Sequence, residues 1–262
     1  MCLEIAALDL RLRRRSVLWY AAGMALYAYL IVAMYPTVSA DTSLESLAAD
    51  NPELLALFGV SGSLTSPTGW LNGNLYANFL PLLVLLVTVA YGGSAIAGQS
   101  ADGTLGLVAT LPLQRRRIVL EKVVALVVLA LPLPLVTLAC AFAGRAYDLE
   151  VGTAALVGTT ATVVLLGVDL GLLAMVVGAT GSGRGLAVGL TSAWAAASYL
   201  VSSLAPVVGW ARTLQPFSLF HWAVGDGQLT SGPSPAAYLV LSAVGAALTA
   251  LVVILVERMD IG

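Results

Sequence analysis

Six long apolar stretches decide what this chain can fold into. They cover residues 16–35, 77–98, 118–143, 153–178, 186–209 and 236–256. An α-helix rises about 1.5 Å per residue, so each stretch reaches the roughly 20 residues that cross the hydrocarbon core of a bilayer. Charged residues make up only 10% of the chain and hydrophobic residues 59%. A soluble domain could not bury that much apolar surface. We therefore expect one all-α integral membrane domain, residues 1–262, with six transmembrane helices.

The positive charges predict how these helices are oriented. Of the twelve Lys and Arg residues, only Arg145 and Arg212 fall on one side of the predicted membrane. The other ten fall on the opposite side: Arg11, Arg13, Arg14, Arg15, Arg115, Arg116, Arg117, Lys122, Arg184 and Arg258. Cytoplasmic loops of membrane proteins carry an excess of Lys and Arg. Both termini are therefore predicted to be cytoplasmic, in a multi-pass protein of the cell membrane, with loops 36–76, 144–152 and 210–235 outside.

The first residues, 1–15, have the pattern of a helix lying in the cytoplasmic membrane surface. Apolar and charged residues fall on different sides of it: Ile5, Leu8 and Leu12 against Glu4, Arg11 and Arg15. A short disordered basic terminus is the alternative. The stretch up to Val38-Ser39-Ala40 also resembles a signal peptide, but its apolar run exceeds the roughly 7–15 residues of a signal core. We favour a retained anchor.

Two further regions carry punctuation that predicts local structure. In the outer loop 36–76, Thr42 with Glu45 fits a capping box, and a helix is expected from Asn51 to Gly59. In the third span, Leu131-Pro132-Leu133-Pro134 predicts a bent or broken helix, because proline removes a backbone donor. The first outer loop is thus expected to be helical, and the third span interrupted.

The fourth span contains Asp169 opposite Gly167 and Gly171, whose spacing lets helices approach closely. An unpaired aspartate facing lipid costs at least about 2.5 kcal/mol, so this helix is expected near the centre of the bundle. Asp169 is either a structural residue, hydrogen-bonded to Thr191 or Ser192, or part of a substrate pathway. The candidates for that pathway are Asp169, Tyr91 and Asn78.

Two motifs resemble enzyme signatures without their essential groups. Residues 178–185 keep the outer glycines of a phosphate-binding loop but carry Arg184 and Gly185 in place of its Lys and its Ser or Thr. We expect a tight turn there. Ser61, between Gly59 and Gly62, resembles a rhomboid protease serine, with His221 as the one available base, but both fall in predicted outer loops. The net charge of −2 averages an acidic outside with a basic inside and says nothing about nucleic acid, but no basic patch for nucleic acid is present. No metal-ligand spacing occurs either.

The most informative stretch is the connection between the second and third spans, residues 99–117. Asp102 can cap a helix of about two turns that Pro112 ends. That helix would be too apolar for water unless another protein received it. Here the sequence resembles the permease subunits of type-2 ATP-binding-cassette (ABC) exporters. The matching residues are Gly103-Thr104-Leu105, Leu111-Pro112, Arg115-Arg116-Arg117 and Lys122, whereas Gly106, Gln99 and Ser100 stand where that family commonly has acids.

The resemblance implies that this connection couples the chain to a separate cytoplasmic ATPase dimer, which binds ATP and magnesium. The chain would bind no cofactor, would not be an enzyme, and would pair with a second copy or a sister permease. The expected interface residues are Asp102, Gly103, Thr104, Leu105, Leu107, Val108, Leu111, Pro112, Arg115 and Arg116. Spans rich in Leu, Val, Ala and Gly favour export of an amphipathic or lipophilic substrate, such as a drug, antibiotic or lipid. The alternatives are an ion-coupled transporter that uses Asp169 and an ordinary surface loop.

Overall fold

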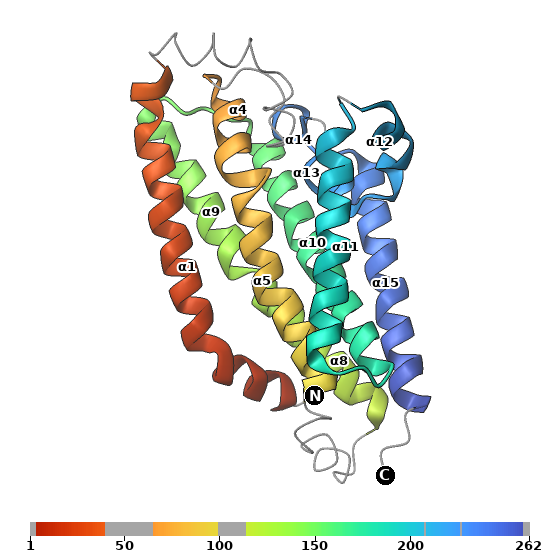
Figure 1. Ribbon diagram of the computed structural model, residues 1–262. Helices are drawn as coiled ribbons and strands as arrows, with labels where there is room; N and C mark the ends of the chain where they lie inside the picture. The colour runs from red at the N-terminus through yellow and green to blue at the C-terminus, as the bar shows by residue number, and fades with distance from the viewer. Residues whose placement is uncertain (1–3, 40–64, 99–113, 207, 226, 259–262) are drawn as a thin grey trace.

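Six helices long and apolar enough to cross a membrane form the protein, as expected. The computed structural model describes residues 4–39, 65–98, 114–206, 208–225 and 227–258. The six helical spans are Glu4–Ser39, Pro67–Gly98, Arg115–Tyr147, Thr153–Ala179, Arg184–Leu204 and Pro235–Arg258. They run alongside one another, and no strand occurs within these residues (Figure 1). The chain is thus a multi-pass helical membrane protein.

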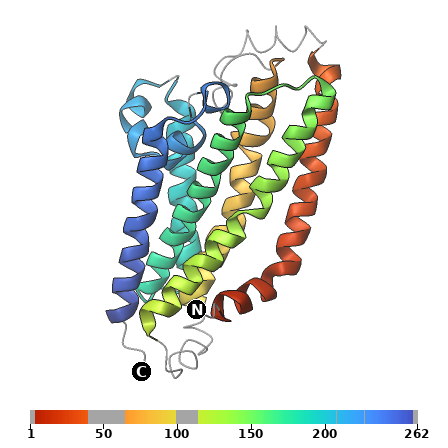
Figure 2. The same cartoon turned by 180° about the vertical axis from the view of Figure 1, so that it is seen from behind.

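The two ends of the bundle differ in charge. Helix α1 (Glu4–Ser39) begins, and helix α15 (Pro235–Arg258) ends, at the same end, which we call the termini end (Figures 1 and 2). The basic run Arg115–Arg117 and Arg184 begin helices at that end too. Arg145 and Arg212 lie in short helices at the opposite end. This segregation agrees with the charge pattern of the sequence.

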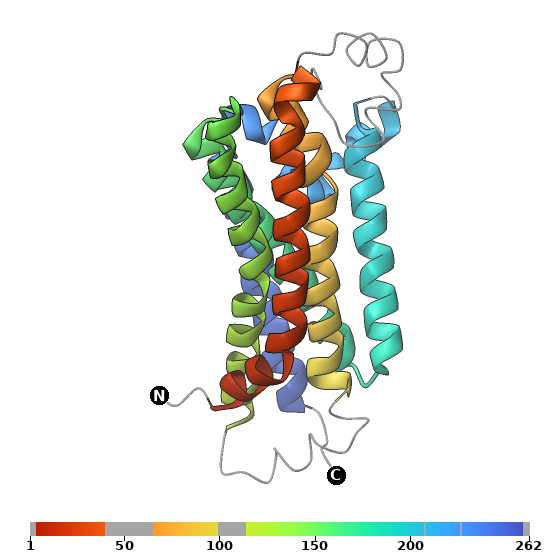
Figure 3. The same cartoon turned by 90° about the vertical axis from the view of Figure 1, so that its left-hand side faces the viewer.

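Helix α1 joins the predicted surface helix and the first span into one element. It starts across the termini end of the bundle and then turns to run along it (Figure 3). Its last residues extend past Pro36 to Ser39. The capping box of Thr42 with Glu45 and the helix expected from Asn51 to Gly59 lie outside the described residues.

The second span begins about ten residues earlier than predicted, so the loop preceding it is shorter than 36–76. It consists of α4 (Pro67–Leu71), a π-helical turn η1 (Asn72–Tyr76), α5 (Phe79–Gly93) and a second π-helical turn η2 (Ser94–Gly98). The Ser66 hydroxyl caps α4 by accepting the N–H of Gly69 at 3.1 Å. The Asn74 amide donates to the carbonyl of Trp70 at 2.9 Å. The hydrogen bond within the helix compensates for the polar side chain, whereas hydropathy alone predicts a loop at this residue.

The predicted break in the third span is confirmed. Helix α8 (Arg115–Ala130) ends before Leu131, and α9 (Pro132–Ala143) begins directly after it, followed by a 3₁₀ turn η3 (Gly144–Tyr147). Pro132 and Pro134 lack the N–H groups that would continue the hydrogen-bond ladder. The two parts run obliquely across the back of the bundle (Figure 2).

Helix α10 (Thr153–Ala179) lies at the centre, as expected from its aspartate. It packs against α5, α8, α15 and α11 (Arg184–Leu204), the last of which ends at Leu204 instead of 209. A Cβ placed on Gly167 would lie 2.4 Å from Val84, and one on Gly171 would lie 2.6 Å from Leu126. The two glycines therefore let α5 and α8 approach α10 closely.

Short helices close the opposite end of the bundle between α11 and α15. They are α12 (Gly209–Leu214), a 3₁₀ turn η4 (Gln215–Phe217), α13 (Leu219–Val224) and α14 (Gln228–Ser231). The hydroxyl of Thr162 on α10 donates to the carbonyl of Ala223 at 2.6 Å. This bond holds α13 against the central helix.

Candidate functional site

Buried charges tie the first part of α1 to α5 and α8 at the termini end. The carboxylate of Asp9, 8% exposed, lies 3.7 Å from the ammonium of Lys122, which is 1% exposed. The hydroxyl of Tyr91 on α5 donates to the same Asp9 oxygen at 2.7 Å. Buried charges are retained where they are paired and hydrogen-bonded, and both conditions hold here. These three residues form what we call the Asp9 cluster.

A second contact fixes the start of α1. The carboxylate of Glu121 on α8 accepts the backbone N–H of Ile5 at 2.9 Å and pairs with Arg117 at 3.1 Å. The first N–H groups of a helix have no partner within the helix, and a negative charge there is favourable. Glu121 therefore serves as an external cap for α1.

Arginine side chains surround a small cavity next to the Asp9 cluster. Arg13 donates to the hydroxyl of Ser94, and its guanidinium carbon lies 5.0 Å from the centre of the Tyr91 ring. The cavity has a volume of about 290 Å³, and Arg184 from α11 lines it as well. The start of α1, the end of the second span and the start of α11 thus meet at one polar site.

The predicted coupling interface falls mostly outside the described residues. This applies to Asp102, Gly103, Thr104, Leu105, Leu107, Val108, Leu111 and Pro112. Arg115 and Arg116 begin α8, and Arg116 is exposed. The Arg115 guanidinium lies 3.5 and 3.4 Å from the carbonyl oxygens of Val256 and Glu257. Arg115 therefore stabilises the last turn of α15, where a cation is favourable.

The three candidates for the substrate pathway lie in three separate places. Tyr91 belongs to the Asp9 cluster. Asn78 precedes α5 and accepts a hydrogen bond from the hydroxyl of Tyr199 on α11. Asp169 projects from the middle of α10 into a different cavity. The candidates therefore do not form one site. Of the two cavities they line, the one that contains Asp169 is the larger.

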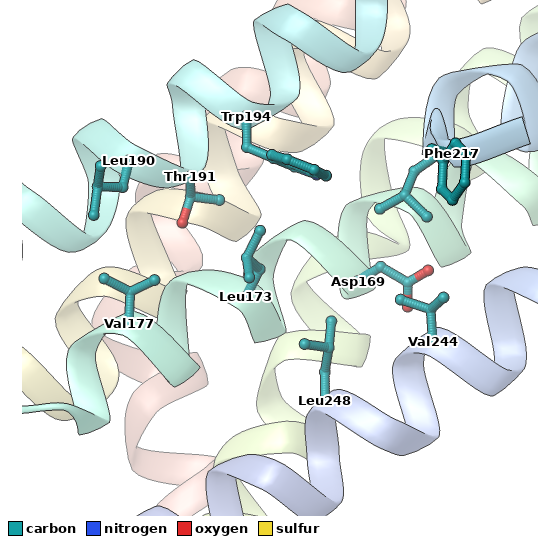
Figure 4. Close-up of a pocket in the computed structure, with 10 residues that line it drawn as sticks. Asp169, Leu173, Val177, Leu190, Thr191, Trp194, Phe217, Val244 and Leu248 are labelled. Carbon is teal, nitrogen blue, oxygen red and sulfur yellow. The ribbon is translucent and has the colours of Figure 1, made fainter. Parts of the chain in front are cut away.

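The Asp169 cavity lies between α10, α11 and α15 and has a volume of about 530 Å³ (Figure 4). Apart from Asp169 and Thr191, the lining is apolar: Leu173, Val177, Leu190, Trp194, Phe217, Leu219, Val244 and Leu248. Asp169 and Thr191 are each only 1% exposed. Such a pocket, apolar with few polar groups, is typical of sites for small molecules.

Asp169 has no hydrogen-bond partner for its Oδ2 among the described residues, and neither has the hydroxyl of Thr191. The hydrogen bond expected between these two residues is therefore absent, although both line the same cavity. Ser192, the other expected partner, is exposed. A Cβ placed on Gly245 would lie 2.7 Å from Asp169 Oδ1. The missing side chain of this glycine on α15 therefore makes space for the Asp169 carboxylate.

The enzyme-like motifs do not form catalytic sites in the described part of the chain. Residues 180–183 form the turn between α10 and α11, in which Gly181 has a φ of +83° and the hydroxyl of Ser182 donates to the carbonyl of Val177. His221 lies in α13 with its ring 5.2 Å from that of Trp222, whereas Ser61 lies outside the described residues. No group of three or more potential metal ligands occurs among the residues that the structure describes.

Comparisons with known proteins add no family to this picture. No protein-family model matches the sequence, and no match was found among curated proteins. The fold itself defines the class, a helical membrane protein whose described residues contain six helices that can span a bilayer.

Proposed function

We propose that this chain is the membrane-spanning permease subunit of an ATP-driven exporter of the type-2 ABC class. The termini end would face the cytoplasm, and a separate ATPase dimer would bind ATP and magnesium there. A second copy of the chain, or a sister permease, would complete the pathway through the cell membrane. The cargo would be amphipathic or lipophilic, because the spans offer few polar groups.

The observation that carries this proposal is where the family-like segment is attached. The segment with Gly103-Thr104-Leu105 and Leu111-Pro112 follows Gly98 and precedes Arg115. Both attachment points lie at the termini end, the end rich in Lys and Arg. An ATPase that binds this segment would therefore act directly on the second and third spans.

The contacts of the Asp9 cluster suggest how such a force would spread. Tyr91 on α5 and Lys122 on α8 hold the same carboxylate of α1, so the three elements would move together at their termini ends. Both α5 and α8 also press on the central helix, where Leu126 fills the space beside Gly171. A displacement of the coupling segment would thus be transmitted to α10.

The test of the proposal uses the coupling segment itself. We expect the double variant Leu105→Glu, Leu107→Glu to lose co-purification with a co-expressed partner ATPase, because two buried carboxylates would oppose docking. Leu214→Glu is the control, since it places the same charge on an exposed leucine of α12 at the opposite end of the bundle. Co-purification of the double variant at the wild-type yield would reject the assignment of this segment.

One observation favours a second candidate, an ion-coupled secondary transporter. Asp169 is an intramembrane acid without a hydrogen-bond partner for Oδ2 in the described part of the chain, and such acids often carry protons or cations. In that case transport would collapse with a protonophore and would be lost in Asp169→Asn. Transport that depends on ATP and survives the protonophore would exclude it.

A further inference from the structure

We propose that the Asp169 cavity binds a monovalent lipophilic cation, with the Asp169 carboxylate as its counter-ion. That the cation is the exported cargo rests on the proposed function, whereas its binding does not. The carboxylate is isolated, the cavity has the shape and lining for such a ligand, and no Lys or Arg of the described residues pairs with Asp169.

The first step is the isolation of Asp169. Two salt bridges occur among the described residues, Arg117 with Glu121 and Lys122 with Asp9, and both lie at the termini end. Asp169 lies in the middle of α10 and takes part in neither. A carboxylate within a membrane span is costly unless it is paired with a positive charge. A bound cation would supply that charge.

The second step is the lining of the cavity. Its volume of about 530 Å³ falls within the roughly 300–1,000 Å³ of pockets that hold drug-sized molecules. Trp194 and Phe217 contribute aromatic rings, which attract cations through the negative charge of their faces. Leu173 and Leu248 supply apolar walls. A single positive charge on a large apolar body matches this combination, whereas a hydrated metal ion or an anion does not.

The third step concerns access. The side chains of Leu190, Trp194 and Phe217 are each more than half exposed at the rim. Helices α11 and α15 both pack on α10, and the cavity lies between them with α10 as its floor (Figure 4). A lipophilic molecule that has partitioned into the membrane could therefore enter the cavity laterally, from the apolar surroundings of the bundle.

The fourth step excludes a second copy of the chain as the source of the charge. Among the described residues, Lys and Arg lie toward the termini end of the bundle or, for Arg145 and Arg212, in the short helices at the opposite end. Lys122 is already buried against Asp9. A second copy packed against α11 and α15 would bring apolar side chains to the depth of Asp169. A small-molecule cation would supply the positive charge that the protein itself does not place beside Asp169.

Binding is tested with two ions of the same shape and opposite charge, tetraphenylphosphonium and tetraphenylborate. Equilibrium dialysis would use the purified full chain in an uncharged detergent. We expect saturable binding of tetraphenylphosphonium that weakens by at least about tenfold in Asp169→Asn, because the variant keeps the shape and loses the charge. Glu150→Gln, which removes an exposed acid outside the cavity, is expected to bind like the wild type. Tetraphenylborate should show no saturable binding.

A second variant keeps the test decisive if Asp169→Asn folds poorly. Leu190→Arg places a fixed positive charge on an exposed rim residue while the carboxylate stays, and we expect it also to weaken tetraphenylphosphonium binding by at least about tenfold because like charges repel. Wild-type affinity in either variant that folds, or saturable binding of tetraphenylborate, would overturn the inference.

The outcome for the site is separable from the outcome for the proposed function. Binding is measured on the chain without its ATPase. Saturable, Asp169-dependent binding without ATP-driven export would support the site and contradict the exporter. ATP-driven export by a chain that binds no tetraphenylphosphonium would support the exporter and overturn the site.

Discussion

Replacing Lys122 by Met is expected to lower the stability of the protein by about 3–5 kcal/mol, the cost of leaving a buried charge without its partner. In the variant, the Asp9 carboxylate would keep the hydroxyl of Tyr91 but lose the ammonium group 3.7 Å away. The midpoint of thermal unfolding in detergent, followed by the helical circular dichroism signal, measures the effect.

Two further variants show whether the effect belongs to this pair. Arg116→Met removes an exposed charge from the same helix and should leave the midpoint nearly unchanged. Asp9→Asn in the Lys122→Met background should recover part of the loss, because it removes the orphaned charge. If the Lys122→Met and Arg116→Met variants had the same midpoint of thermal unfolding, the Asp9 cluster would not be holding α1 to the bundle.

Replacing Gly92 by Ala is expected to produce the second large loss. A Cβ at this position would lie 2.1 Å from the carbonyl oxygen of Gly171, and a backbone atom in the central helix has little freedom to move away. Inserting a methyl group into a packed interior costs about 1–3 kcal/mol, and occasionally more. The same unfolding measurement tests this expectation.

The matched control is Gly189→Ala on α11, where an added Cβ meets nothing within 4 Å. Alanine favours a helix over glycine by about 1 kcal/mol, so this variant should be at least as stable as the wild type. Equal unfolding midpoints for the two alanine variants would contradict the close packing of α5 on α10.

Hydropathy predicted the number of spans well because the length of an apolar run reports directly on the bilayer. It placed the start of the second span wrongly, because polar residues there make hydrogen bonds within their own helix. Asn72, Gly73 and Asn74 read as loop, yet Asn74 donates to a carbonyl one turn earlier and the helix passes through them. The break at Leu131 was predictable, because proline acts on its own helix without regard to the rest of the fold.

The contacts of the candidate sites were less accessible to sequence reasoning. Asp9 and Lys122 lie 113 positions apart in the sequence, and pairing over such a separation depends on how the helices pack. A signal was present, since Asp9 follows Ile5 by one turn and precedes Leu12 by another, which places an acid on the apolar side of the helix. Likewise, helix periodicity predicted that Asp169 lies on the opposite side of α10 from Gly167 and Gly171. It could not predict that Gly245 on α15 would face Asp169.

The most direct test of the proposed exporter is the energy source of transport. Cells would express this chain alone, a partner ABC ATPase alone, or both, and export of amphipathic fluorescent dyes would be followed over time. We expect export only with both subunits, arrested by vanadate or ATP depletion and unaffected by a protonophore. Export by this chain alone, insensitive to vanadate and abolished by the protonophore, would contradict it.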